Sequence, residues 1–229
     1  MNELRAIIDR TFRAILADGA ILCIRFGPGQ EIMEACRAGW RGGLRVVELT
    51  LTTPGAIEAM DLLAREAKTA GQGYMVGGGT VLTTDQVRAV ERAGGRFVLS
   101  PVFDPRIVDA ADRLGLLAIP GAATATEILA AHRHGTRAVK IFPSGPLGGP
   151  AFLKTVRGPL PEIPLIPTSG PDAENLTAYF KAGAVAVGVG AEVFPPGFTP
   201  ESAEAAARRV RRAIDACRSD PTVACDKEP

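Results

Sequence analysis

The feature that most constrains the fold of this 229-residue chain is a short apolar run, then a turn, then a stretch with helical spacing, repeated along the sequence. The apolar runs, rich in β-branched and small residues, are expected as strands at 20–26, 44–51, 74–77, 97–100, 117–119, 138–142, 165–168 and 184–189. Strands that alternate with helices are parallel, because a parallel connection needs a crossover of helix length. This rhythm predicts an α/β fold, a (β/α)8 TIM barrel. An open doubly wound sheet is the rival, but it typically has fewer strands.

Helices are expected in the intervening stretches, at 30–38, from Thr53-Pro54 onward, 84–93, 105–114, 124–132, 150–156, 172–182 and from about 200. Three of their starts carry capping signals. Thr53 and Thr199 each precede a proline, which is favoured at the first helical position. Thr124 and Glu127 have the spacing of a capping box.

The chain is expected to form a single domain. Residues 1–19 have the pattern of an additional N-terminal amphipathic helix, with charged residues interspersed among apolar ones. No linker or shift in composition divides residues 1–218, so this range is predicted as one barrel domain. Residues 219–229 lack apolar periodicity and are predicted to be a disordered tail.

Charge and hydropathy limit the partners. The 26 Lys and Arg residues nearly balance the 25 Asp and Glu residues, so no excess positive charge is available for a nucleic acid or an anionic membrane. No apolar run reaches the roughly 18 residues that span a bilayer, and the N-terminal stretch lacks the apolar core of a signal peptide. The expected partner is a small molecule, and the expected location is the cytoplasm.

A metal site is not expected. The cysteines lack the spacing of metal ligands and are interpreted as reduced structural thiols; they are Cys23, Cys36, Cys217 and Cys225. His132 and His134 lie two residues apart on a predicted helix, where side chains do not face each other. No carboxylate or cysteine completes a ligand set around them.

Candidate functional residues lie where the predicted strands end, because the active sites of such barrels lie on the loops at the C-terminal ends of the strands. In chain order these positions are Arg25, Glu48, Gly77-Gly78-Gly79-Thr80, Ser100-Pro101, Pro120-Gly121, Lys140 with Phe142-Pro143, Thr168-Ser169-Gly170, and Gly188-Val189-Gly190.

Lys140 is the most informative of these residues. It lies in the run Ala138-Val139-Lys140-Ile141-Phe142, which is otherwise suited only to burial. Lysine is almost never fully buried unless it is paired or functional. Burial favours the uncharged amine, the form that a nucleophile requires. The alternative is a lysine whose stem packs in the strand while its ammonium reaches the rim.

Glu48 gives Lys140 a candidate partner. Strand alternation places it on one face with Val46 and Thr50 in a run too apolar to hold a carboxylate without reason. If that face is the lumen, an amine and a carboxylate meet inside the barrel. A static buried pair is a poor stabilising device. As chemistry, the amine attacks a ketone and the carboxylate moves protons, so that no metal is needed.

The glycine-rich segments are candidates for anion binding. Gly77-Gly78-Gly79-Thr80 is either a tight turn or a set of backbone N–H groups and a hydroxyl for a substrate carboxylate. The turns after the last two strands stand where such barrels commonly bind phosphate. Arg25 is either an anion clamp or a partner in a salt bridge at the rim.

These motifs, taken in order, resemble a known family. The segments that carry the resemblance are Gly77-Gly78-Gly79-Thr80-Val81, Ser100-Pro101, Ile119-Pro120-Gly121, Val139-Lys140-Ile141-Phe142-Pro143 and Pro167-Thr168-Ser169-Gly170. Together they are similar to the 2-keto-3-deoxy-6-phosphogluconate (KDPG) aldolases, a family that includes 4-hydroxy-2-oxoglutarate (KHG) aldolase activity. The match runs from about residue 20 to residue 194.

The resemblance implies a trimeric, metal-independent class I aldolase that uses no cofactor and cleaves KDPG to pyruvate and glyceraldehyde 3-phosphate. Lys140 matches the Schiff-base lysine and Glu48 matches the general acid and base. Thr80 matches a threonine near the substrate carboxylate. The predicted substrate-binding residues are Arg25, Thr52, Gly79, Thr80, Pro101, Phe142, Thr168, Ser169, Gly170, Gly188 and Gly190. Within this set, Pro101 and Phe142 match the pocket wall, and Thr168 matches a position near the substrate hydroxyls.

Three positions depart from the pattern of the family. Thr52 stands where many members have an arginine, Ser169 stands in place of the first glycine of a pair, and Ala191 stands where a serine is common. The arginine and serine contribute to anion binding in those members, so these departures bear on the substrate. Arg25 is a candidate for the missing charge. Lys140 and Glu48 are unaffected.

Other functions stay open at this point. Within the class, the alternatives are aldolases acting on KHG or on the galactonate epimer of KDPG. A phosphate-binding isomerase or synthase, in which Lys140 only neutralises an anion, predicts that Lys140→Arg keeps activity. A ligand-binding barrel without catalysis predicts pyruvate binding but no turnover.

Overall fold

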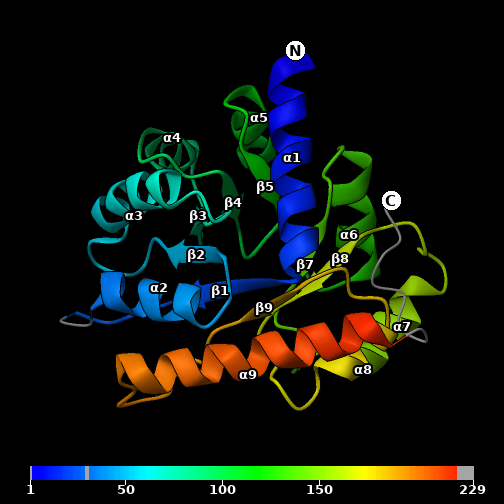
Figure 1. Cartoon of the computed structure of the whole chain (residues 1–229). Helices are drawn as coiled ribbons and strands as arrows, with labels where there is room; N and C mark the ends of the chain where they lie inside the picture. The colour runs from blue at the N-terminus through cyan, green and yellow to red at the C-terminus, as the bar shows by residue number, and fades with distance from the viewer. Residues whose placement is uncertain (1, 29–30, 221–229) are drawn as a thin grey trace.

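The computed structural model, which describes residues 2–28 and 31–220, has parallel strands surrounded by helices (Figure 1). Helix α1 (Asn2–Asp18) precedes the first strand, as predicted. The strands are β1 (Ala20–Ile24), β2 (Val46–Thr50), β3 (Met75–Gly79), β4 (Phe97–Leu99), β5 (Leu117–Ile119), β6 (Gly121–Ala122), β7 (Val139–Ile141), β8 (Leu165–Pro167) and β9 (Val187–Val189). The predicted fold class is confirmed.

The strands form a closed ring. One sheet has the order β5-β4-β3-β2-β1-β9 and the other has the order β6-β7-β8, with every pairing parallel. Only Pro120 separates β5 from β6, and its carbonyl accepts a hydrogen bond from the N–H of Lys140 (2.8 Å). On the other side, bridges from Leu165 to Ala184 and from Thr168 to Gly188 join β8 to β9. If β5 and β6 are counted as one strand, the ring has the predicted eight strands.

The remaining helices lie outside the ring (Figure 1). They are α2 (Ile32–Arg41), α3 (Ala56–Ala70), α4 (Thr84–Arg92), α5 (Pro105–Arg113), α6 (Ala125–Arg133), α7 (Pro150–Arg157), α8 (Leu176–Lys181) and α9 (Pro200–Ser219). The capping box of Thr124 and Glu127 is confirmed, and so is the capping role of Thr199. Of the predicted tail, Ser219 belongs to α9, whereas residues 221–229 lie outside the described residues.

The predicted capping role of Thr53 is wrong. Helix α3 begins at Ala56, and Gly55, with a φ of 76°, is its N-cap. Thr53 is buried, and its hydroxyl oxygen accepts a hydrogen bond from the N–H of Phe26 (3.0 Å). Its hydroxyl also lies 3.0 Å from that of Thr50. Thr53 therefore ties the loop after β1 to the end of β2 instead of starting the helix.

Helix α8 begins later than predicted, at Leu176 rather than near Asp172. Asp172 and Asn175 bond to each other reciprocally. The N–H of Asp172 donates to Asn175 Oδ1 (2.9 Å), and the N–H of Asn175 donates to Asp172 Oδ1 (2.9 Å). This side-chain turn competes with the helix, which is the usual behaviour of Asp and Asn.

Helix α1 closes the N-terminal end of the barrel. Its residues Ile8, Phe12 and Ile15 share an apolar cluster with residues from the starts of the strands, among them Val46 and Ala138. These strand residues therefore point into the lumen. Because strand side chains alternate, the residues two positions further along also face the lumen. Those residues on β2 and β7 are Glu48 and Lys140, which lie in the layer above the apolar floor.

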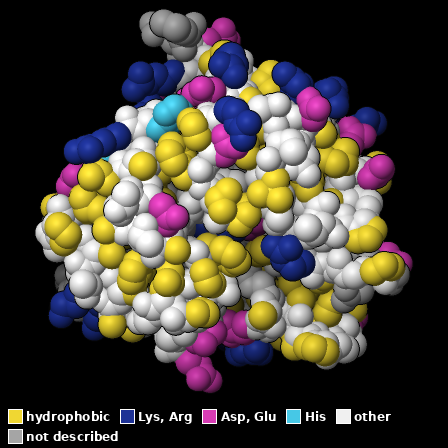
Figure 2. Space-filling view, turned by 180° about the vertical axis from the view of Figure 1, so that it is seen from behind, with side chains coloured by type: hydrophobic (Ala, Val, Ile, Leu, Met, Phe, Trp, Pro, Cys, Tyr) yellow, Lys and Arg dark blue, Asp and Glu magenta, His cyan; other side chains and the backbone are white. Residues whose placement is uncertain are grey.

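The outer surface carries charges of both signs, interspersed with apolar side chains on the face shown in Figure 2. No helix among the described residues is long and apolar enough to cross a membrane. That residues 1–218 form a single domain stays a prediction.

Candidate active site

Lys140 and Glu48 meet inside the barrel, as the sequence predicts. The Nζ of Lys140 on β7 lies 3.6 Å from the Oε1 of Glu48 on β2. Lys140 is 5% exposed and Glu48 is fully buried. The separation is that of an ion pair and is longer than a normal hydrogen bond. Neither carboxylate oxygen has a hydrogen-bond partner among the described residues. The carboxylate therefore has free capacity to exchange a proton with a ligand.

Gly79 makes room for the carboxylate of Glu48. A Cβ atom at Gly79 would lie 1.9 Å from the Oε1 of Glu48, so any side chain there would displace the carboxylate. A Cβ atom at Gly77 would lie 2.5 Å from the carbonyl oxygen of Phe97. The sequence left open whether this segment is a tight turn. In the structure both glycines belong to strand β3, which packs closely against its neighbours. Thr80, the next residue, has a left-handed φ of 57°.

Phe142 contacts Lys140, whereas Pro101 contacts the neighbouring strand β6. The Nζ of Lys140 lies 5.3 Å from the centroid of the Phe142 ring, within the range of a cation–π contact. The Phe142 ring thus lies beside the amine of Lys140, and its place in the wall of a substrate pocket stays a prediction. Pro101, in the loop after β4, packs against Gly121 so closely that a Cβ there would be 2.3 Å from the Pro101 carbonyl oxygen. Pro101 thus packs on β6, whose Gly121 pairs in register with Lys140, and its place in the pocket wall stays a prediction.

Arg25 is held at the mouth of the barrel by two threonines. Its Nη1 donates to Thr52 Oγ1 (2.8 Å) and its Nη2 donates to Thr80 Oγ1 (2.8 Å). Thr52 in turn donates to Thr50 Oγ1 (3.2 Å). No carboxylate pairs with Arg25 within residues 2–28 and 31–220, so the predicted alternative of a rim salt bridge is not found. An uncompensated guanidinium in a fixed orientation is suited to an anion.

The predicted residues at the ends of β8 and β9 come together at the mouth, next to β1. Thr168 is buried, and its Oγ1 has no hydrogen-bond partner among the residues described. A Cβ at Gly188 would lie 2.4 Å from that Oγ1, and a Cβ at Gly190 would lie 2.6 Å from the carbonyl oxygen of Cys23. Ser169 has a left-handed φ of 63°, and Gly170 follows it. The free hydroxyl of Thr168 is available to a ligand.

Cys23 is a site residue that the sequence analysis missed. It pairs in register with Glu48 across β1 and β2, so the two side chains lie on one face of the sheet. Burial and the carboxylate of Glu48 raise the pKa of the Cys23 thiol well above its usual range. The thiol is therefore protonated at neutral pH and is a potential weak donor beside Glu48. The signal available in the sequence was its spacing of two residues from Arg25.

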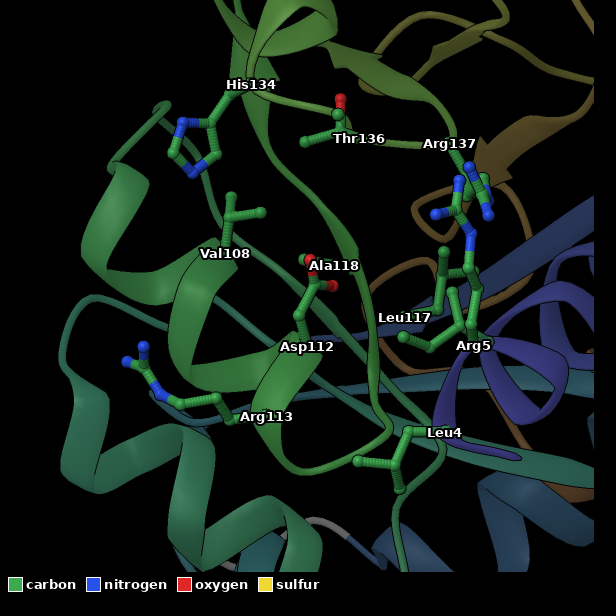
Figure 3. Close-up of a pocket in the computed structure, with 12 residues that line it drawn as sticks. Leu4, Arg5, Val108, Asp112, Arg113, Leu117, Ala118, His134, Thr136 and Arg137 are labelled. Atoms are coloured by element: carbon green, nitrogen blue, oxygen red, sulfur yellow. The ribbon is translucent and has the colours of Figure 1, made fainter. Parts of the chain in front are cut away.

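A hollow lies beside helix α1, and Figure 3 shows residues that line it. This cavity of about 590 Å³ lies between α1, α5 and the segment before β7. Leu4, Arg5, Asp112 and Thr136 are among its lining residues. None of the predicted site residues lines it, and it is separate from the Lys140 and Glu48 pair.

The histidines do not form a metal site with their neighbours. His134 Nε2 lies 2.8 Å from Asp109 Oδ1, and His132 Nδ1 is buried with no hydrogen-bond partner within residues 2–28 and 31–220. Among the residues that the structure describes, no group of three or more His, Cys, Asp or Glu side chains is arranged to hold a metal ion. Metal independence stays a prediction.

Comparison with known proteins places this geometry in a family. The family model "KDPG and KHG aldolase" matches residues 13–207. The 2-dehydro-3-deoxy-phosphogluconate aldolase of Treponema pallidum is 37% identical over 66% of this chain and 70% of its own length. The probable 2-dehydro-3-deoxy-6-phosphogalactonate aldolase of Rhizobium meliloti is 32% identical over 69% of this chain and 73% of its own length.

A solved structure adds the chemistry of a relative. The KDPG aldolase from Legionella pneumophila, with pyruvate captured as a covalent carbinolamine intermediate, is 28% identical and has a TM-score of 0.72. The match covers 89% of this chain and 96% of the Legionella chain. A carbinolamine is the adduct of an amine and a ketone, the reaction predicted for a buried lysine. The chain belongs to the KDPG and KHG aldolase family, and it is a carbon–carbon lyase of the class I type.

Proposed function

We propose that this enzyme cleaves KDPG to pyruvate and glyceraldehyde 3-phosphate through a Schiff base on Lys140, without a metal or another cofactor. The observation that carries the proposal is the isolated pair of Lys140 and Glu48, 3.6 Å apart in the barrel lumen. A buried carboxylate with no hydrogen-bond partner among the described residues is costly to the fold unless it has a task. Proton transfer to and from a bound keto acid is such a task.

The proposed reaction begins when Lys140 gives a proton to Glu48. The uncharged amine then attacks the C2 ketone, and a proton passes from its nitrogen to the ketone oxygen to form the carbinolamine. Glu48 donates a proton to the carbinolamine hydroxyl, water leaves, and an iminium forms. The Glu48 carboxylate then removes the proton from the C4 hydroxyl, and the C3–C4 bond breaks. The electron pair of that bond moves into the iminium to give an enamine, and the aldehyde leaves. Glu48 returns the proton to C3, and hydrolysis of the imine releases pyruvate.

The two ends of the substrate are assigned to two different sets of residues at the mouth. Arg25, fixed by Thr52 and Thr80, is proposed to bind the carboxylate next to the reacting ketone. This arrangement lets Arg25 supply the charge for which many members use an arginine at the position of Thr52. The distal phosphate is proposed to bind near Ser169, Gly170 and Gly190, on the turns after β8 and β9.

The identity of the distal group is the finer part of the proposal. KHG and the galactonate epimer of KDPG are the alternatives, because the family model covers KHG aldolases and one relative is a probable phosphogalactonate aldolase. Ser169 and Ala191, which depart from the family pattern, lie where phosphate is expected. A phosphate preference of a hundredfold in kcat/KM corresponds to about 2.7 kcal/mol of differential transition-state binding.

The test is pyruvate release from purified enzyme supplied with KDPG, its galactonate epimer or KHG. The proposal expects the highest kcat/KM with KDPG. A higher value with either alternative would correct the substrate and leave the imine chemistry in place. No pyruvate from any of the three would contradict the proposed function.

The proposal extends to a homotrimer in the cytoplasm. Leu82 and Val102, which follow the adjacent strands β3 and β4, are 51% and 52% exposed, and such side chains are suited to a subunit contact. Cys36 and Cys217 are free and buried, which fits a reducing compartment. Size-exclusion chromatography with light scattering measures the mass in solution and tests the trimer. A monomeric mass at micromolar concentration would contradict it.

A further inference from the structure

The hydroxyl of Tyr179, on α8, lies beneath the loops that follow β7 and β8. Tyr179 is 1% exposed, and Ser144, in the loop after β7, is fully buried. The Ser144 hydroxyl donates a hydrogen bond to the Tyr179 Oη (3.2 Å). A Cβ at Gly170, in the loop after β8, would lie 2.5 Å from the same Oη. One phenol oxygen therefore touches both loops.

Backbone hydrogen bonds tie the two loops to each other above this oxygen. The N–H of Ser144 donates to the carbonyl of Thr168 (2.9 Å), and the N–H of Gly145 donates to the carbonyl of Ser169 (2.7 Å). The side chain of Asn175 donates from Nδ2 to the carbonyl of Gly170 (2.9 Å). Each carbonyl of the turn at 168–170 thus accepts a hydrogen bond from a residue outside the turn.

Ser169 shows why this turn depends on outside contacts. Its φ of 63° lies in the left-handed region, which is unfavourable for a residue with a side chain. Such a conformation persists when the surroundings over-determine it. Two contacts supply this restraint: the close approach of Tyr179 Oη to Gly170, and the hydrogen bond from the N–H of Gly145 to the carbonyl of Ser169.

We infer that Tyr179 is a positioning residue for the distal end of the substrate, acting through Ser144 and the Ser169-Gly170 turn. The inference rests on the proposed function, in which that turn binds the group at the far end of the keto acid. Pyruvate has no distal end. Its proposed partners are Lys140, which lies beside Glu48, and Arg25, which bonds to Thr52 and Thr80. The Tyr179 hydroxyl instead contacts the loops of Ser144 and Gly170. Tyr179 therefore acts on binding of the full substrate and not on imine formation with pyruvate.

The test is the variant Tyr179→Phe, which removes only the hydroxyl. We expect KM for the full substrate to rise about fivefold, the factor typical for one lost hydrogen bond. The rate at which borohydride traps pyruvate on the enzyme should stay within twofold of wild type. Ser144→Ala, which removes the other partner, should raise KM in the same direction.

A matched control is Tyr74→Phe. This variant also loses one hydrogen bond, from the Tyr74 hydroxyl to Gln72 Oε1 (2.7 Å). Tyr74, however, lies just before β3, at the opposite end of the barrel. Its KM should match that of wild type. Thermal unfolding of each variant establishes that the protein is folded.

Hydrogen exchange gives a readout that does not depend on turnover. Peptides that contain residues 168–170 should exchange faster in Tyr179→Phe, while peptides from β2 should not change. Unchanged exchange at 168–170 would overturn the positioning role. Faster exchange with an unchanged KM would overturn the role in distal binding. A fall in the rate of pyruvate trapping as large as the rise in KM would overturn it too. A wild-type enzyme that releases no pyruvate from any substrate contradicts the proposed function instead, and the exchange result still decides the positioning role.

Discussion

The Nζ of Lys140 and the Oε1 of Glu48 lie 3.6 Å apart although their strands, β7 and β2, stand on opposite sides of the ring. Both side chains cross the lumen to meet, and both are buried. Desolvation of two charges offsets most of their attraction, so the pair is a poor means of stabilising the barrel. Its position above an apolar floor and below the open mouth suits it to a keto acid that enters from the C-terminal face.

Glu48→Gln should lower kcat by at least about a hundredfold, because the amide cannot exchange protons with the bound intermediate. The shape of the side chain is kept, so KM should change by less than about fivefold. Steady-state kinetics with the best substrate measure both values. The control is Glu66→Gln, on the helical layer, where Glu66 pairs with Arg37. Wild-type turnover in Glu48→Gln would remove this carboxylate from the mechanism.

Gly79→Ala should lower kcat by about a hundredfold, since an added methyl would meet the Glu48 carboxylate and displace it by an ångström or more. The matched control is Gly158→Ala, where the new Cβ would lie no closer than 3.3 Å to Thr155 O and the backbone is helical. Kinetics and thermal unfolding of both variants separate displacement of Glu48 from a loss of folding. If the Gly79 variant is folded and fully active, Glu48 does not need this position.

Arg25→Gln should weaken pyruvate binding by about tenfold or more, the usual loss for a hydrogen bond to a charged group. Arg25→Lys keeps the charge but cannot bond to Thr52 and Thr80 at the same time. Its affinity for pyruvate should therefore lie between those of wild type and Arg25→Gln. Titration with pyruvate measures the affinities. Arg65→Gln, which breaks an exposed pair with Asp61, is the control. Equal affinity in all four proteins would assign carboxylate binding elsewhere.

Asp18 should make the stability of the fold depend on pH. Burial raises the pKa of this carboxyl from 3.8 to about 6, and the nearby Arg211 only partly opposes the shift. Between these pH values the folded chain keeps a proton that the unfolded chain releases. The stabilising contribution is therefore present below about pH 4 and is lost as the pH rises through 6. Two units correspond to about 3 kcal/mol.

The measurement is urea unfolding of wild type and Asp18→Asn at pH 5 and pH 7.5. Between these two pH values the variant should gain about 1.4 kcal/mol relative to wild type, because about half of the total change already lies below pH 5. Asp85→Asn, at an exposed carboxylate, should show no such dependence. A difference between Asp18→Asn and wild type that is the same at both pH values would contradict this account of Asp18.

The sequence is sufficient to predict the parts of this protein that follow from periodicity. Lys140 and Glu48 stand out because each is a charge in an apolar strand, and a period of two places both in the lumen once the ring is closed. Thr124 is recognisable as a cap because its partner Glu127 lies three residues away, and Thr199 because Pro200 follows it. These features are local, so the printed sequence contains everything they depend on.

Other features depend on contacts between distant segments. Thr53 has the local pattern of a cap but bonds to Phe26, 27 residues earlier. Cys23 reads as an ordinary buried thiol, and only the register of β1 against β2 places it beside Glu48. Tyr179 lies on a short helix with no motif, and its contact with the loop of Ser144 exists only after the ring has closed. No local pattern encodes these three contacts.

The most direct test of the central claim is borohydride reduction in the presence of pyruvate, followed by digestion and mass spectrometry. The account predicts a reduced pyruvyl adduct on Lys140 in the wild-type enzyme and no adduct in Lys140→Arg, because guanidinium cannot form the imine. Lys154, on α7, lies in the same digest and serves as the internal control for nonspecific modification. Pyruvate that binds to wild type but leaves Lys140 unmodified would contradict the Schiff-base mechanism.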